Sequence, residues 1–433
     1  MAENSGRRYR VALVHDWLTG LRGGERCLLK FLELYPQADI YTLVHEPGTT
    51  TDEIDKKVRG TSIIQRFPIL RKNYRALLPL FPFIARTVTV KDYDLVISLS
   101  HAAAKNVRLV NCDKHICYCF TPMRYIWDMA PVYLGTVRAA LLSPLLRWLQ
   151  RWDRNGAQGV DHFVAISNFV ASRIRKFYGR SASVIYPPVS SRWKTIPLNR
   201  PETAPKHKRA FLYAGAFVPY KGVEHIIKAF NELGMPLWCV GSGPLEKELR
   251  DQAMPNVEFL GTVSDDELAF YYRNCRALLF PALEDFGMIP VEAMMSGAPV
   301  IAGYYGATRE TIPGLRPWIR EAWDPEYHAG VFFPPPRNKR GSKQRGLSAR
   351  IVEAVRTFIE IERSFERETA IQAASRFTSE QFVNGWQEVV EAERMVDSAG
   401  ITAVTLREKS SDGHRKVVPF NSKPHIQRVS TKV

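Results

Sequence analysis

Two glutamates, Glu284 and Glu292, lie eight positions apart in the segment FPALEDFGMIPVEAMMSGAPVIAG, residues 280–303. The apolar run before Glu284 predicts a strand, and VEAMMSG predicts a helix that starts near Pro290 and ends at Gly297. Glu284 then lies on the turn after the strand, and Glu292 lies inside the helix. Free N–H groups and the positive dipole of a helix N-terminus suit a phosphate. Because the flanking acids would bind hydroxyl groups, the pattern predicts a site for a sugar nucleotide.

Two more turns in the second half of the chain have features of phosphate sites. In LYAGAFVPYKG, Lys221 follows Gly215 by six residues, beyond the end of a predicted strand, and its ammonium is a point charge suited to phosphate. In VGSGPLEKEL, Gly241 and Gly243 lie between a predicted strand and a predicted helix. Ligands of open α/β sheets bind beyond the carboxyl ends of the strands. We therefore expect these turns to lie with Gly287, which allows close backbone approach, along one ligand-binding edge.

Apolar strand-like runs alternate with helical periodicity through both halves of the chain. Such alternation predicts an α/β protein with mostly parallel, doubly wound sheets covered on both faces. The polar, proline-containing stretch after Pro188 indicates a linker. The predicted parts are an N-terminal domain over 1–191, a linker over 192–208, a C-terminal domain over 209–375, a helix over 376–399 that packs back on the N-terminal domain, and a basic disordered tail over 400–433.

The chain of 433 residues carries 60 Lys and Arg against 44 Asp and Glu, a formal net charge of +16. This excess predicts acidic partners, which are nucleic acid, anionic lipid or phosphorylated substrates. No groove-reading motif is present, so nucleic acid is not expected. The six cysteines lack metal-ligand spacing, which favours reduced thiols in a cytoplasmic protein. The first residues lack the apolar region of a signal peptide, so we expect a soluble or surface-bound protein.

Two segments, residues 63–83 and 137–152, mix Arg and Lys with Leu, Phe and Trp. Segments of this kind lie well in the headgroup region of a membrane, and the net charge favours an anionic surface. We predict peripheral attachment to the inner face of the cytoplasmic membrane. The alternative is that the apolar residues belong to the domain core while the charges face water.

The segment EDFGMIPVEAM resembles the E-x7-E motif of the retaining glycosyltransferases of family 4, which have the GT-B fold. VHDWLTGLRGGE, TPMRYIWD, GVDHFVAISNFVASRIRKFYGR and VIYPPV look like the bacterial branch that builds surface polysaccharide, often with mannose from GDP-mannose. The resemblance covers roughly residues 8–395. It implies two Rossmann-like domains that face a central cleft, with the donor on the C-terminal domain. It also implies transfer with retention of anomeric configuration and without a metal or cofactor.

The resemblance assigns roles to residues of this chain. It implies that Glu284 contacts the transferred sugar, that Glu292 contacts the ribose and that Lys221 neutralises the diphosphate. Gly23 and Gly24 would line the cleft from the N-terminal domain. The candidate donor-binding residues are Glu292, Gly287, Phe286, Met288, Gly215, Gly241 and Gly243.

Two departures from the family pattern bear on activity. Relatives often carry an Arg directly after the glycine that corresponds to Gly215, where this chain has Ala216. They also often carry a His before Thr-Pro, where this chain has Phe120. His101, as a catalytic candidate, and Arg124, as a cleft residue, are the side chains that would compensate.

The sequence therefore predicts a transferase that moves a sugar, mannose from GDP-mannose, to a lipid-linked oligosaccharide. Its expected partners are the sugar nucleotide, that acceptor and an anionic membrane surface. We expect same-face substitution, because no second carboxylate suits the role of nucleophile. The alternatives are a different GDP- or UDP-sugar donor, or a non-catalytic sugar-nucleotide-binding or scaffold subunit.

Overall fold

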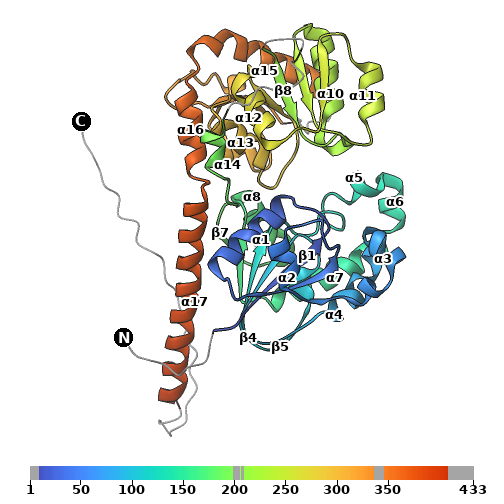
Figure 1. Ribbon diagram of the computed structural model, residues 1–433, viewed down its shortest axis with the longest axis vertical. Helices are drawn as coiled ribbons and strands as arrows, with labels where there is room; N and C mark the ends of the chain where they lie inside the picture. The colour runs from blue at the N-terminus through green and yellow to red at the C-terminus, as the bar shows by residue number, and fades with distance from the viewer. Residues whose placement is uncertain (1–8, 198–204, 206–208, 336–345, 408–433) are drawn as a thin grey trace, which may run out of the picture. The chain divides into compact units, whose positions relative to one another are not determined.

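The computed structural model describes residues 9–197, 205, 209–335 and 346–407, with side chains described up to residue 393. The chain divides into two compact units, residues 1–384 and 385–433. The first unit holds both sheets of the molecule (Figure 1). In the second unit, the described residues continue the helix α17, Ser379–Arg407.

The first sheet contains, within the described residues, seven parallel strands in the order β3-β2-β1-β4-β5-β6-β7. In the register of its centre, Val14 of β1 lies beside Tyr41 of β2 and Ser98 of β4. Every residue of β1 is buried, as expected for a central parallel strand covered on both faces. The strands are β1 Val11–Leu18, β2 Asp39–His45, β3 Val58–Thr61, β4 Thr89–Ser100, β5 Arg108–Cys119, β6 His162–Ala165 and β7 Ser183–Val184.

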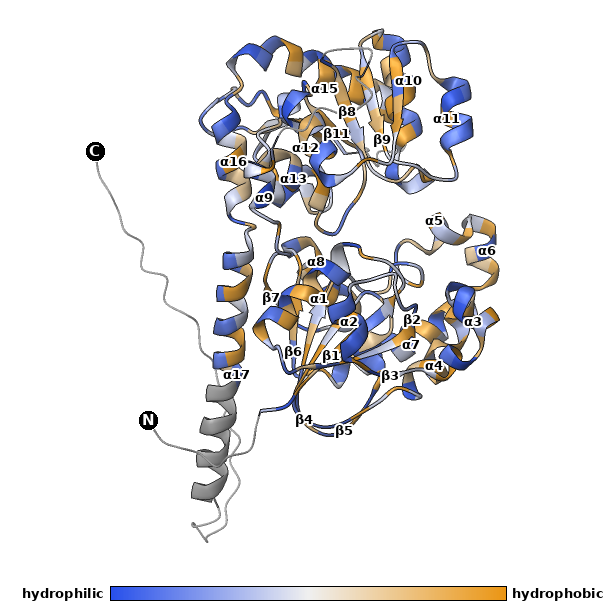
Figure 2. Cartoon of the chain, viewed as in Figure 1, coloured by the Kyte–Doolittle hydropathy of each residue, from blue (hydrophilic) through white to orange (hydrophobic). Residues whose placement is uncertain are grey.

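The second sheet has the order β10-β9-β8-β11-β12-β14-β13, again seven parallel strands in the part of the chain described. Its central strands consist of buried apolar residues and are coloured hydrophobic in Figure 2. The strands are β8 Phe211–Ala214, β9 Leu237–Val240, β10 Val257–Gly261, β11 Leu278–Phe280, β12 Val300–Gly303, β13 Gly314–Leu315 and β14 Gly330–Phe333. The two doubly wound sheets confirm the predicted fold class.

Helices cover both sheets, and their ends follow local sequence signals. The hydroxyl of Ser167 accepts a hydrogen bond from the N–H of Val170 and so caps α8, which ends at Gly179 in the left-handed region. The α-helices of the first sheet's domain are α1 Gly23–Leu34, α2 Asp52–Lys57, α3 Pro68–Lys72, α4 Phe81–Arg86, α5 Ala130–Leu134, α6 Thr136–Leu141, α7 Ser143–Gln158 and α8 Asn168–Tyr178. Those that follow are α9 Arg192–Thr195, α10 Val223–Leu233, α11 Glu246–Gln252, α12 Asp265–Asn274, α13 Met288–Met295, α14 Thr308–Thr311, α15 Leu347–Ile361 and α16 Arg367–Ser375.

Three expectations about irregular segments need correction. The predicted linker begins with helix α9, because Trp193 is buried and its carbonyl accepts hydrogen bonds from Arg273 and Ser296. The basic, proline- and glycine-containing sequence of residues 334–350 predicts a loop, but helix α15 starts within it at Leu347 and buries an apolar stripe. The backbone remains helical to Arg407, past the predicted start of the tail at residue 400. The rest of the tail, 408–433, lies outside the described residues, as do 198–204, 206–208 and 336–345.

The helix predicted over 376–399 contacts the N-terminal domain at its start. The ring of Phe382 lies 5.4 Å from that of Phe31 and 5.8 Å from that of Tyr118, centroid to centroid. Just before the helix, the N–H of Val189 donates to the carbonyl of Phe377 over 2.8 Å. These contacts fix the position of the chain where it enters α17.

Candidate active site

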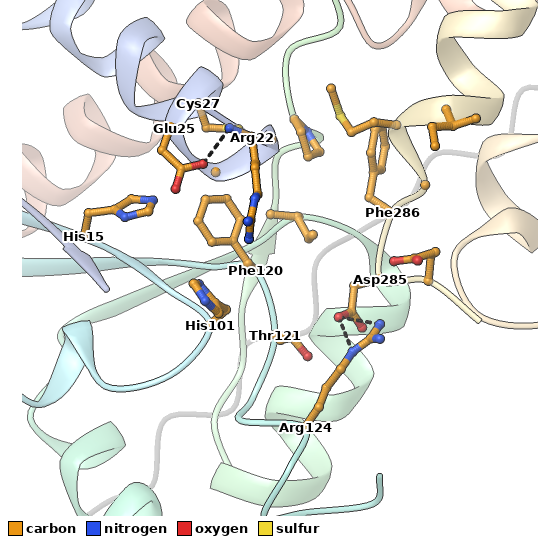
Figure 3. Close-up of a pocket in the computed structure, with 18 of the residues that line it drawn as sticks. His15, Arg22, Glu25, Cys27, His101, Phe120, Thr121, Arg124, Asp285 and Phe286 are labelled. Carbon is orange, nitrogen blue, oxygen red and sulfur yellow. Dashed lines mark hydrogen bonds and ion pairs between the residues drawn. The ribbon is translucent and has the colours of Figure 1, made fainter. Parts of the chain in front are cut away.

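A cavity of about 410 Å³ lies at the carboxyl ends of central strands from both sheets. The strand order reverses between β1 and β4 and between β8 and β11, and such switch points are where open α/β sheets bind ligands. Figure 3 shows the side chains that converge on it. The lining residues are His15, Trp17, Arg22, Gly23, Gly24, Glu25, Cys27, His101, Phe120, Thr121, Arg124, Ile166, Pro187, Lys221, Phe280, Glu284, Asp285, Phe286, Gly287, Met288 and Ile289.

Glu284 and Lys221 meet in this pocket. Glu284 lies on the loop after β11, and Lys221 ends the short 3-10 helix Pro219–Lys221 that follows β8. Because β8 and β11 are neighbours, the two side chains come together and form an ion pair. Both side chains remain about one-fifth exposed, so they are accessible to a ligand in the cavity.

The N-terminus of α13 faces the same cavity. Gly287 is the N-cap of α13 and has a φ of 84°, a conformation that glycine adopts without strain. Phe286, Gly287 and Met288 all line the pocket. The helix start therefore presents its dipole and early N–H groups to the same cavity as the Lys221 ammonium, an arrangement suited to an anion.

Glu292 lies one turn further along α13 and does not line the cavity. Its carboxylate is buried, and one oxygen lies 4.0 Å from the guanidinium of Arg26 on α1. Burial raises the pKa of Glu292 to about 7, and the negative charge of Asp265 adds to this, while Arg26 acts in the opposite direction. Near neutral pH this side chain is therefore poised between a carboxylic acid and a carboxylate.

Three predicted donor-binding glycines, Gly215, Gly241 and Gly243, lie outside the cavity lining. A Cβ on Gly241 would lie 2.0 Å from the carbonyl oxygen of Gly215, and one on Gly243 would lie 2.5 Å from that of Phe217. Packing therefore explains glycine at positions 241 and 243, because the turns after β8 and β9 approach each other closely. Their contact with a donor remains a prediction.

On the N-terminal side, the loop after β4 is organised by Asp16, a residue that the sequence did not single out. Its buried carboxylate accepts hydrogen bonds from the N–H groups of four consecutive residues, 101–104, at 2.6 to 2.9 Å. It also contacts Nδ1 of His101 at 2.9 Å. Burial would raise the pKa of Asp16, but the interactions with His101 outweigh it and hold the pKa below its ordinary value. The ionised carboxylate fixes the loop.

His101 is oriented on two sides. Asp16 holds Nδ1, and the ring packs edge-on against Trp17 with 4.4 Å between centroids. The other ring nitrogen is left available at the cavity, as in carboxylate–histidine pairs that fix a tautomer. His15 is different, because burial lowers its pKa and its Nδ1 donates to the Trp17 carbonyl over 3.0 Å. His15 is therefore neutral.

Gly23 and Gly24 line the cavity at the start of α1. A Cβ on Gly24 would lie 3.1 Å from Nε2 of His15, and one on Gly23 would lie 3.9 Å from the Met288 side chain. The amide of Arg22 donates to the Glu25 carboxylate over 2.9 Å, which satisfies the helix start. Phe120 also lines the cavity, so an apolar ring occupies the position where relatives often carry His.

Arg124 has a partner that sequence reasoning did not foresee. It contacts Asp285 on the loop beside Glu284, with Nε and one terminal nitrogen each 2.7 Å from the same carboxylate oxygen (Figure 3). The Ser167 hydroxyl also donates to the Asp285 carbonyl over 2.5 Å. Burial would lower the pKa of Arg124, but Asp285 outweighs it and raises the pKa. Arg124 therefore holds the loop that carries Glu284.

Two family models match consecutive parts of the chain. Residues 21–192 match the model described as Glycosyltransferase Family 4, and residues 196–314 match the model described as Glycosyl transferases group 1. The chain belongs to the family 4 glycosyltransferases. The E-x7-E motif thus lies in the second matched region of this family 4 chain, and the glycine turn of Gly23 lies in the first.

The curated relatives of this glycosyltransferase are similar over part of their length. It is 32% identical over 157 residues to an uncharacterized glycosyltransferase of Methanocaldococcus jannaschii, which covers 35% of this chain and 42% of the relative. It is 27% identical over 211 residues to a GDP-mannose-dependent alpha-(1-6)-phosphatidylinositol monomannoside mannosyltransferase of Mycobacterium tuberculosis, covering 43% of this chain and 51% of the relative. The chain therefore matches about half or less of the length of these relatives.

The solved structure of Anabaena HepE in complex with UDP has a similar fold. It superposes with a TM-score of 0.61 at 17% identity, over 88% of this chain and 100% of that chain. The likeness confirms the predicted GT-B fold.

Two other kinds of feature are absent from the described residues. No three His, Cys, Asp or Glu side chains come together there in a way that would hold a metal ion. No helix in this part of the chain is both long enough and apolar enough to span a bilayer.

Proposed function

We propose that this family 4 glycosyltransferase moves mannose from GDP-mannose to a lipid-linked oligosaccharide with retention of anomeric configuration. The observation that carries the proposal is the convergence of Lys221, Glu284 and the N-terminus of α13 on one cavity. These groups match a diphosphate joined to a sugar. The Mycobacterium tuberculosis relative, whose name specifies GDP-mannose and a phosphatidylinositol mannoside, supports the choice of donor and of a lipid-borne acceptor.

The proposed reaction breaks the bond between the anomeric carbon and the diphosphate oxygen. The electron pair of that bond passes to the diphosphate, where Lys221 and the α13 N–H groups stabilise the growing negative charge. The acceptor hydroxyl attacks the same face of the sugar, and its proton passes to a phosphate oxygen of the leaving group. In this scheme no metal ion is required, since the ammonium and the helix dipole supply the positive charge.

Glu284 serves as the carboxylate near the transferred sugar. Donor binding separates it from Lys221, because the ammonium turns to the diphosphate and the carboxylate accepts hydrogen bonds from sugar hydroxyls. Its negative charge also favours the positive character that the ring gains as the glycosidic bond breaks. Glu292 is buried behind the cavity lining, and for this residue we keep the role that the resemblance implies, a contact with the ribose of the donor. Arg124 acts on the reaction through Asp285, which anchors the loop of Glu284.

Membrane attachment is part of the proposal and rests on exposed apolar side chains of the N-terminal domain. Ile69, Phe83, Val137 and Leu141 are 76%, 64%, 71% and 76% exposed. They lie within or beside helices that also carry Arg and Lys, namely α3, α4 and α6. Other apolar residues of the same segments, such as Leu146 and Leu149, are in the core. We expect the exposed apolar side chains of α3, α4 and α6 to enter the headgroup region of the membrane.

Donor turnover tests the proposal. Purified protein is incubated with GDP-mannose, other GDP-sugars and UDP-sugars, and release of nucleoside diphosphate is measured with and without EDTA. We expect slow hydrolysis of GDP-mannose that EDTA does not reduce and that falls at least about a hundredfold in E284A and K221A. E326A, which changes an exposed glutamate of the same domain, is the matched control. Preference for another donor would overturn the choice of mannose. Tight donor binding without turnover, even with membrane extract as acceptor, would favour a non-catalytic subunit.

A second assay tests attachment. Flotation with liposomes that contain anionic lipid should recover the wild-type chain, and a variant with Ile69 and Phe83 changed to Ser should stay in the soluble fraction. Equal flotation of the two proteins would show that these side chains do not form the anchor.

A further inference from the structure

The N-terminal domain has a second cavity, a groove of about 790 Å³ at the base of α4 and α7. Of the described residues that line this groove, none lines the donor cavity as well. Its walls come from α4, the 3-10 helix Ala104–Asn106, the start of β5 and α7. The groove is thus a separate feature, to which the proposed transfer reaction assigns no role.

The groove is strongly cationic. Arg86, Arg108 and Arg151 line it and are exposed. Among the residues that the structure describes, none of the three guanidinium groups has an ion pair or side-chain hydrogen bond, and the lining includes no Asp or Glu. The fourth cation, Lys105, is buried and paired with Asp153. Three unpaired positive charges around one concavity repel one another and create a positive potential that an anion relieves.

Large aromatic side chains form one rim of the groove. Phe83 of α4 and Trp148 of α7 lie with 6.3 Å between ring centroids and are 64% and 42% exposed. An exposed pair of such rings is costly in water but favourable at the boundary between headgroups and acyl chains. In Figure 2, α4 and α7 each carry both hydrophilic and hydrophobic colours. The groove thus combines a cationic interior with an interfacial rim, which matches the two ends of an anionic amphiphile.

We propose that this groove binds the headgroup phosphate of an anionic membrane phospholipid. Arg86, Arg108 and Arg151 donate charge-assisted hydrogen bonds to the phosphate oxygens, for which the guanidinium group is well shaped. Phe83 and Trp148 lie at the level of the glycerol backbone. This inference rests on the membrane attachment proposed above and adds to it a defined lipid site. If the site exists, membrane binding depends on these three arginines in particular. General electrostatic attraction to the bilayer would depend only on the number of positive charges.

The test compares two triple variants of the full chain that lose the same charge. R86Q/R108Q/R151Q alters the groove, and K228Q/K247Q/R363Q removes three exposed cations of the C-terminal domain. Affinity is measured by flotation against vesicles of phosphatidylcholine alone and of phosphatidylcholine with phosphatidylglycerol. Each arginine is expected to contribute a factor of roughly ten or less to the affinity for the mixed vesicles. The groove variant should therefore bind these vesicles about a hundredfold more weakly than wild type, while the control variant should stay within about threefold of wild type.

Several outcomes would overturn the inference. Equal losses in the two variants would show that net charge alone matters, and wild-type affinity in the groove variant would show that the groove is not used. An arm with inorganic phosphate as the probe separates the two sources of this chemistry. If phosphate at millimolar concentration releases the wild-type chain from mixed vesicles at constant ionic strength, the groove is a site for free phosphate. Thermal unfolding of both variants should match wild type, since all six side chains are exposed. Donor hydrolysis without lipid decides the proposed transferase independently of these results.

Discussion

The buried carboxyl group of Glu292 predicts that stability falls as pH rises. Its pKa in the folded protein is about 7, against an ordinary value of 4.5. Because the folded pKa is the higher one, the folded state holds a proton that the unfolded state releases between these values. The contribution of Glu292 to the free energy of unfolding is therefore fully present below pH 4.5, decreases between pH 4.5 and about pH 7, and is absent above about pH 7. The difference between the folded and the ordinary pKa corresponds to about 3 kcal/mol of stability, since a pKa difference of one is worth about 1.4 kcal/mol.

The substitution Glu292→Gln removes this titration while preserving shape. Relative to wild type, the variant should gain about 2 kcal/mol between about pH 5.5 and about pH 8, the part of the titration in that range. For a domain of this size the gain corresponds to a relative rise in melting temperature of about 4–8 °C. The quantity compared is the change in stability between the two pH values. Losing the contact with Arg26 shifts the stability of the variant equally at both values, so this effect cancels.

Differential scanning calorimetry of the two proteins at both pH values measures this change. E326Q, at an exposed position of the same domain, is the matched control and should track wild type. If E292Q and wild type keep a constant difference in melting temperature across this range, Glu292 does not titrate near neutrality. In that case burial does not raise the pKa of Glu292.

Three further substitutions test other parts of the site. D16N should cost about 3–6 kcal/mol in urea unfolding, because an amide cannot accept two of the four backbone hydrogen bonds that the carboxylate accepts; a loss below about 1 kcal/mol would contradict this. R124M should cost about 3–5 kcal/mol, because it leaves Asp285 buried and unpaired, and R124M/D285N should recover part of the loss; no recovery would argue against the pair. G241A should lower the melting temperature through a loss of about 3 kcal/mol or more, since its Cβ would lie 2.0 Å from the Gly215 oxygen; unchanged stability would leave a ligand role as the remaining reason for glycine.

Much of the fold could be predicted because parallel strands buried on both faces are nearly continuous apolar runs. The runs around β1, β8, β11 and β12 illustrate this. The short strands β3 and β13 lack this signal. β3 is VRGT and β13 has two residues, so neither carries a hydrophobic pattern, and their places depend on pairing with neighbouring strands.

The site was predictable where a residue lies just beyond a recognisable strand. Glu284, Lys221 and Gly287 meet this condition, and the structure brings them to one cavity. Asp16 did not meet it, because its role depends on four amides from residues 101–104, more than eighty positions away. The pairing of Arg124 with Asp285 likewise spans 161 positions. Contacts of this range follow from how the loops meet in space, and single-sequence patterns carry no signal for them.

The contacts that Arg124 and Ser167 make with Asp285 bear on how the two halves of the molecule can move. Asp285 is covalently adjacent to Glu284, so the Glu284 carboxylate is held in place by side chains from the other half of the molecule. Separating the halves would leave the buried Asp285 carboxylate without its counter-ion, and both charged groups would have to be rehydrated. Any movement that separated the two halves here would therefore carry an electrostatic cost beside the carboxylate for which we propose the sugar contact, and weakening the Arg124–Asp285 pair would trade accuracy of alignment for ease of movement.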